Sequence, residues 1–144
     1  MNDNHKPLIL VTMGDPSGIG PEIVAMALNN EKIYKNAKPI VVGSTAIIKR
    51  TVKSYELNQN VRPFKNFKET EFHPDIINVI DDYELDPDKV VTGKIQKQSG
   101  QSSYNYIEEA IDLIQKNEFD AMATAPIYKE ALKMADIPEA GCTE

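Results

Sequence analysis

The 144-residue sequence has only one cysteine, Cys142, and only two histidines, His5 and His73. A single cysteine excludes an internal disulfide and fits a reducing compartment. Neither histidine has a second ligand at metal-site spacing, so no metal site is expected within the chain. No His/Cys/Asp triad can be assigned either. Metal chemistry and cysteine chemistry are therefore not predicted from these residues alone.

Long hydrophobic runs are also missing. The apolar run at residues 8–13 is too short for the hydrophobic part of a secretion signal or for a membrane span. The formal net charge of -6 argues against nucleic acid and anionic membrane as partners. Apolar residues make up 41% of the chain and charged residues 26%, as in soluble globular proteins. We therefore expect a cytoplasmic protein with one domain-sized core.

Short apolar stretches alternate with amphipathic ones along the chain. Strands are predicted at residues 8–13 (buried on both faces), 39–43, 61–64, 76–80 and 119–125. Helices are predicted at residues 21–28, 44–55 and 128–134, and around the helically spaced Tyr104, Ile107, Ala110, Ile111 and Ile114. Residues 57–75 and 82–100 are predicted to be irregular, with an extended piece at 89–92, and Ser99–Ser103 precede the long helix. This alternation predicts an α/β fold, with a parallel-type sheet and flanking helices.

The first motif is the stretch Gly-Asp-Pro-Ser-Gly-Ile-Gly-Pro-Glu at residues 14–22. It predicts a turn between a strand and a helix, in which glycines let a ligand approach the main chain. The N-terminus of the helix attracts anions. Asp15 falls at the carboxyl end of a strand, where α/β active sites form, and Gly18 and Gly20 lie in the same turn. The pattern equally fits a turn that only packs a helix on a sheet, and it matches neither a Walker A loop nor a Rossmann fingerprint.

The second motif is Thr-Ala-Pro-Ile-Tyr-Lys-Glu-Ala at residues 124–131. A strand again ends in a turn, and Lys129 falls in the first turn of the next helix, from which it could reach a phosphate or carboxylate. A solvated helix lysine explains the same residue. The last residues, Gly141 to Glu144, carry no chemistry of their own, because a free cysteine is more often a small buried apolar residue than a nucleophile.

In order and spacing, these three segments resemble the 4-hydroxythreonine-4-phosphate dehydrogenase family, including its threonate and erythronate 4-phosphate dehydrogenase relatives. The family usually has alanine where this sequence has Ser17, and Gly-His-Thr-Glu where it has Gly-Cys-Thr-Glu. Thr143 matches a substrate-binding threonine, whereas Cys142 stands where the family has a substrate-binding histidine. A thiol donates weaker hydrogen bonds than imidazole and is uncharged near neutral pH.

The resemblance implies a fold like that of isocitrate and isopropylmalate dehydrogenases, in a homodimer with the active site between two domains. It implies NAD-dependent oxidation, with decarboxylation, of a 4-phosphorylated hydroxy acid such as 4-phosphohydroxy-L-threonine in vitamin B6 biosynthesis. A divalent metal ion (Zn, Mg or Co) would assist, and NAD would accept the hydride. The alternative within the family is a D-threonate or D-erythronate 4-phosphate dehydrogenase of sugar-acid catabolism.

Family members are more than twice as long as this chain, and their metal ligands lie in the part that has no counterpart here. We therefore expect residues 1–6 to form a flexible tail, 7–138 the N-terminal part of the first α/β domain, and 139–144 the start of the crossover to a second domain. The chain alone is expected to be inactive. The alternative from another functional class is a non-catalytic binding module that kept the fold.

Overall fold

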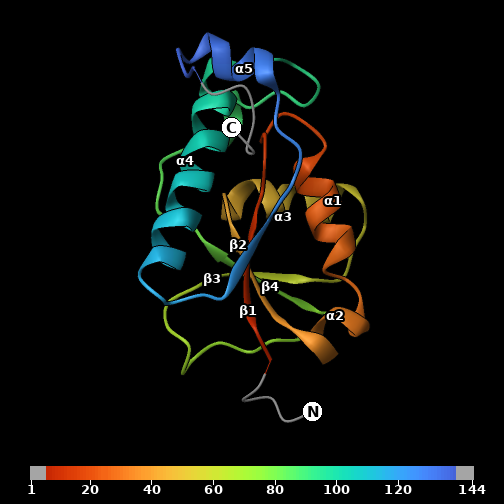
Figure 1. Cartoon of the computed structure of the whole chain (residues 1–144). Helices are drawn as coiled ribbons and strands as arrows, with labels where there is room; N and C mark the ends of the chain where they lie inside the picture. Colours follow the sequence, from red (N-terminus) through yellow and green to blue (C-terminus); the bar gives the residue numbers. More distant parts are fainter. Residues whose placement is uncertain (1–5, 139–144) are drawn as a thin grey trace.

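A computed structural model describes residues 6–138, which form a parallel five-stranded sheet flanked by helices (Figure 1). Its strands are β1 (Leu8–Thr12), β2 (Lys38–Val42), β3 (Asn60–Pro63), β4 (Ile76–Ile80) and β5 (Ala121–Thr124). They lie in the order β3-β4-β2-β1-β5, and every neighbouring pair is parallel. The predicted fold class is confirmed.

Helices cover the two faces of the sheet unequally. They are α1 (Gly20–Ala27), α2 (Glu31–Asn36), α3 (Thr45–Ser54), α4 (Lys97–Gln115) and α5 (Lys129–Met134), with a 3-10 turn at Pro87–Lys89. The helices α1 and α3 contact each other, whereas α4 packs on β1, β2 and β5 from the opposite face, and α5 packs on α4 (Figure 1). None of the helices within residues 6–138 has the length and apolar character needed to cross a membrane.

The core lies between these layers. All five residues of β4 are buried, as are the last four of β2. Isoleucine and valine dominate both strands, because β-branched side chains pack well on a pleated surface covered on both faces. The predicted strands and helices at residues 39–43, 76–80, 21–28 and 44–55 are confirmed to within a residue or two.

The start of α4 corrects the prediction for Ser99–Ser103. These residues lie inside the helix, which begins at Lys97 rather than after them. Serine and glycine favour turns, but here they are small enough to bring α4 against α5. A Cβ on Gly100 would lie 2.0 Å from the carbonyl oxygen of Ala131. Tertiary packing thus overrides the local preference.

Two further details of local structure differ from the prediction. The short helix α2 at Glu31–Asn36 was not predicted; the Asn30 side chain caps it by accepting a hydrogen bond from Lys32 N. The predicted extended piece at residues 89–92 is shorter than expected, because Lys89 ends the 3-10 turn; Val90 is extended, but none of the four residues pairs with the sheet. The 3-10 turn is set by Asp86, whose side chain accepts a hydrogen bond from Asp88 N.

The β1 and β5 side of the sheet is less covered than predicted. Ile9 and Val11 of β1 are only half-buried, and β5 is an edge strand with mostly exposed residues. Ile9 and Val11 line an apolar groove of about 320 Å³ together with Ile23 of α1 and Ala123 of β5. The prediction that β1 is buried on both faces therefore fails, because no described element covers this groove.

At the carboxyl end of β4, Glu109 of α4 meets other carboxylates. Burial raises the pKa of Glu109 to about 8, aided by a hydrogen bond shared with Asp82 and by the negative charges of Asp82, Asp81 and Asp112. Because this pKa is above its ordinary value of 4.5 in the folded chain, the protonated form stabilises the fold. That contribution is fully present below the unfolded pKa and is lost as the pH rises through about 8.

We therefore expect Glu109→Gln to flatten the dependence of stability on pH. The free energy of unfolding of the unmodified chain should fall, relative to the variant, between about pH 5 and about pH 9. Urea unfolding at several pH values measures this. Glu108→Gln, on an exposed residue of the same helix, is the control and should keep the slope of the unmodified chain. Parallel curves for Glu109→Gln and the unmodified chain would contradict the assignment.

Candidate functional site

The glycine-rich turn after β1 is fastened to the turn after β5. Asp15 N donates a hydrogen bond to the carbonyl oxygen of Pro126 at 3.1 Å. Gly14 has φ +75°, a left-handed conformation, and a Cβ there would lie 2.4 Å from the same oxygen. Only glycine satisfies both conditions without strain. The two motifs of the sequence thus form one structural unit at the carboxyl ends of two neighbouring strands.

Asp15 stabilises this turn from inside. Its side chain is fully buried, and Oδ1 accepts a hydrogen bond from Ser17 N at 2.7 Å. Burial raises the pKa of the Asp15 carboxyl, and hydrogen bonds from Ser17 and Gly18 N–H groups partly offset this effect. Its Oδ2 atom makes no hydrogen bond within residues 6–138. Asp15 therefore shapes the turn rather than facing an open cavity.

Ser17 links the turn to the start of α4. Its hydroxyl donates a hydrogen bond to Gln96 Oε1 at 2.9 Å and lies 2.5 Å from Ser99 Oγ. Gln96 also accepts a hydrogen bond from Val91 N and donates one to the carbonyl oxygen of Lys89. A hydrogen-bonded network thus holds three separate segments together, and an alanine at position 17 could not make these side-chain bonds.

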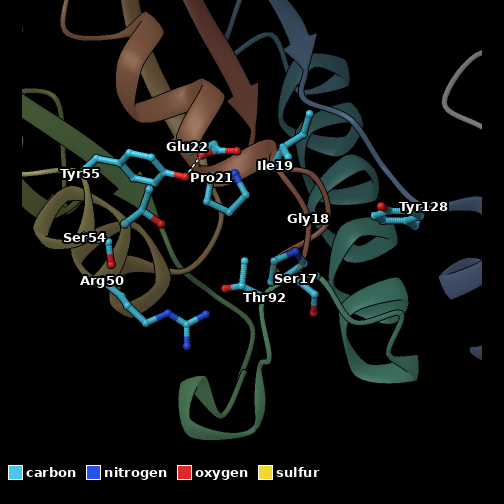
Figure 2. A pocket seen from close by; sticks show the side chains of 13 residues that line it. Ser17, Gly18, Ile19, Pro21, Glu22, Arg50, Ser54, Tyr55, Thr92 and Tyr128 are labelled. Carbon is cyan, nitrogen blue, oxygen red and sulfur yellow. Dashed lines mark hydrogen bonds between the residues drawn. The ribbon is translucent and has the colours of Figure 1, made fainter.

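A cavity of about 430 Å³ opens beside the glycine-rich turn (Figure 2). Its walls come from the turn and α1, from α3, from residues 92–93, and from Tyr128. Its volume is in the range of small-molecule sites. The helix α1, which follows β1, and the helix α4, which precedes β5, lie on opposite faces of the sheet (Figure 1). In open α/β sheets, ligands bind at the carboxyl ends of neighbouring strands whose connecting helices lie on opposite faces.

The four candidate cleft residues from the sequence differ from one another in their position relative to the cavity. Gly18 lines the cavity, and a Cβ on Gly18 would lie 3.3 Å from the Cε2 atom of the Tyr128 ring. Asp15 and Gly20 are buried, and a Cβ on Gly20 would lie 2.2 Å from the carbonyl oxygen of Met13. Lys129 is exposed at the first residue of α5 and is not among the cavity's lining residues.

Sequence reasoning did not find Arg50 and Ser54 of α3, nor Tyr55 directly after it, although all three line the cavity. They belong to no motif, and only the position of α3 beside α1 brings them to the turn. Tyr128 lies inside the second motif, but its role is visible only from its place in the cavity wall beside Gly18. Cys142 and Thr143 lie outside the described residues, as do residues 1–5.

Within residues 6–138 no group of three or more histidine, cysteine, aspartate or glutamate side chains could hold a metal ion. The described residues therefore do not fit a metal site. The cavity itself presents a glycine-rich main chain, an arginine, a glutamate and hydroxyl groups. Such an arrangement suits the binding of a small polar, anionic molecule.

Residues 35–144 match the model of a protein family described as pyridoxal phosphate biosynthetic protein PdxA. The chain belongs to the PdxA family. Two similar curated proteins, from Clostridium botulinum and Halalkalibacterium halodurans, are provisionally named D-threonate 4-phosphate dehydrogenase. Each aligns over 141 residues, at 35% and 37% identity respectively. The alignments cover 98% of this chain and 42% of each relative.

Solved structures agree with this family. A 4-hydroxythreonine-4-phosphate dehydrogenase from Burkholderia phymatum superposes with a TM-score of 0.91 at 32% identity, over 98% of this chain and 42% of that one. The chain thus spans less than half the length of the relatives it matches. The family resemblance found from the sequence motifs is confirmed. The curated relatives and the solved structure are all named as dehydrogenases.

Two glycine variants test how the glycine-rich turn is held. Gly93 also has a positive φ, of +86°, but a Cβ there would meet nothing within 4 Å. We expect Gly93→Ala to cost about 1–2 kcal/mol of stability, for the left-handed backbone alone. Gly14→Ala adds the collision with Pro126 and should cost about 3 kcal/mol or more. Chemical denaturation measures both, and equal losses would show that the contact with Pro126 does not constrain Gly14.

Proposed function

We propose that this chain is the N-terminal part of a dehydrogenase that oxidises a 4-phosphorylated hydroxy acid, with NAD as the hydride acceptor. The observation that carries the proposal is the joining of the two family motifs into one unit. The Asp15–Pro126 hydrogen bond sets the glycine-rich turn beside residues 124–131, with the cavity next to them. Membership of the PdxA family supports the class of reaction.

Two substrates follow from the names of relatives. The curated relatives point to D-threonate 4-phosphate, and the solved structure points to 4-hydroxythreonine-4-phosphate, which would place the protein in vitamin B6 biosynthesis. Both are four-carbon acids with a phosphate ester at one end. In either, the secondary alcohol carbon would give a hydride to NAD, and the hydroxyl would lose its proton. The β-keto acid so formed would then lose CO2.

The described residues of this chain would contribute binding rather than proton transfer. The glycine-rich turn offers main-chain groups at the start of α1, whose N-cap residue Ile19 makes no side-chain capping bond. Helix N-termini attract anionic groups. A divalent metal ion, if bound by the completed protein, would supply positive charge beside the reacting oxygen atoms. We propose that its ligands belong to the part of the relatives that this chain does not match.

We also propose that this further part covers the apolar groove beside β5. The edge strand of a sheet is a site for pairing with another strand, and within residues 6–138 β5 has a neighbouring strand on one side only. Ile23 and Met26 of α1 are 41% and 47% exposed, and Ile19 at the N-cap of that helix is 55% exposed; Ile23 also lines the groove. A homodimer, as the family resemblance implies, would be assembled from the completed subunits.

Activity should therefore depend on a further part of the protein, the one that corresponds to the region of the relatives that this chain does not match. We expect NAD reduction with D-threonate 4-phosphate or 4-hydroxythreonine-4-phosphate only when that part is present, and none from the 144-residue chain alone. Absorbance of NADH at a fixed protein concentration measures this. The ratio of kcat/KM for the two acids identifies the substrate.

The unphosphorylated acids are the control for that assay and should be poor substrates. Turnover by the 144-residue chain alone would contradict the proposal that the metal ligands lie elsewhere. A completed protein that binds NAD but turns over neither acid would indicate a non-catalytic module.

A further inference from the structure

The basic side of the cavity is formed by Arg50 of α3. This side chain is half-buried, and its Nη1 atom donates hydrogen bonds to the carbonyl oxygens of Pro87 and Val90, at 3.0 and 3.1 Å. These two bonds fix the guanidinium group between α3 and the segment that leads to residues 92–93. The orientation of the group is therefore set by the fold and does not depend on a ligand.

The charge of Arg50 is not neutralised within the described residues. It makes no ion pair in residues 6–138, and its Nε and Nη2 atoms have no hydrogen-bond partner there. A guanidinium group has five N–H donors, so the two carbonyl bonds leave most of its donors unused. An arginine with free donors on a cavity wall matches the geometry of phosphate oxygens.

The other charged group of the cavity occupies a separate place. Glu22 of α1 accepts a hydrogen bond from the hydroxyl of Tyr55, and Figure 2 shows this pair apart from Arg50 along the cavity wall. Ser54 lies on the same helix as Arg50 and also lines the cavity. An anion would therefore be favoured at the Arg50 side, and groups that donate hydrogen bonds at the Glu22 side.

We propose that Arg50 and Ser54 form a phosphate subsite of this cavity, which binds the phosphate group of a ligand whose hydroxyl groups face Glu22. The phosphate could belong to the phosphorylated hydroxy acid or to the diphosphate of NAD, because both present the same oxygens to a guanidinium group. This inference deepens the proposed function, from which it takes the choice of ligands. The binding of phosphate itself can be measured without any turnover.

The test measures binding of inorganic phosphate to the 144-residue chain by titration calorimetry. We expect saturable binding that Arg50→Met weakens at least about tenfold, the effect of losing a charge-assisted contact. Lys49→Met is the matched control, because Lys49 is an exposed cation on the same helix and does not line the cavity. It should weaken binding less than about twofold, as expected for a screened surface charge. Equal effects of the two variants, or no saturable binding, would overturn the proposal.

Arg50→Met also removes the bonds to Pro87 and Val90, so it could unfold that segment. Ser54→Asp leaves those bonds in place and adds a negative charge at an exposed residue of the cavity wall. We expect Ser54→Asp to abolish phosphate binding while the circular dichroism spectrum stays unchanged. Phosphate binding that survives in the folded Ser54→Asp variant would overturn the proposal.

The source of the phosphate is identified by repeating the titrations with D-threonate 4-phosphate and with NAD. A loss of affinity in Arg50→Met or Ser54→Asp for the acid alone assigns the subsite to the substrate, and a loss for NAD alone assigns it to the cofactor. Unchanged affinity for both would overturn the inference. If a completed protein bound phosphate through Arg50 but had no dehydrogenase activity, the subsite would stand and the proposed function would be wrong.

Discussion

The hydrogen bond from Asp15 N to the carbonyl oxygen of Pro126 joins two segments that are more than 100 residues apart in sequence. It exists because Gly14 adopts a left-handed backbone and has no Cβ to meet that oxygen. The turn that this bond holds contains Ser17 and leads into α1. The contact thus sets the wall of the candidate site that the turn forms, whereas the wall with Arg50 depends on the packing of α3 beside α1.

The sequence predicts most of the fold because its central strands β1, β2 and β4 are short apolar runs, two of which are followed by a glycine. It fails where tertiary contacts decide. Ser99–Ser103 were predicted to precede the long helix, yet these residues are helical, and the missing side chain of Gly100 lets α4 pack against α5. β1 reads as buried on both faces, yet Ile9 and Val11 face a groove that no described element covers. Neither outcome is visible in local composition.

The residues of the candidate site likewise include some that the sequence indicates and others that only the structure reveals. Gly18 was found from its motif and does line the cavity. Asp15 and Gly20 belong to the same motif, but their burial shows that they build the turn. Arg50 had no sequence signal at all, since its importance comes from the packing of α3 beside α1. A motif therefore locates a site, whereas the contributions of its residues depend on the packing around them.

We propose that the glycine-rich turn forms a wall of a ligand-binding cleft. A crystal structure of the completed protein with NAD and a 4-phosphorylated hydroxy acid bound tests this most directly. We expect a ligand in contact with Gly18 and Tyr128, in the cavity shown in Figure 2. A structure in which other parts of the protein fill this cavity, with both ligands bound elsewhere, would contradict it.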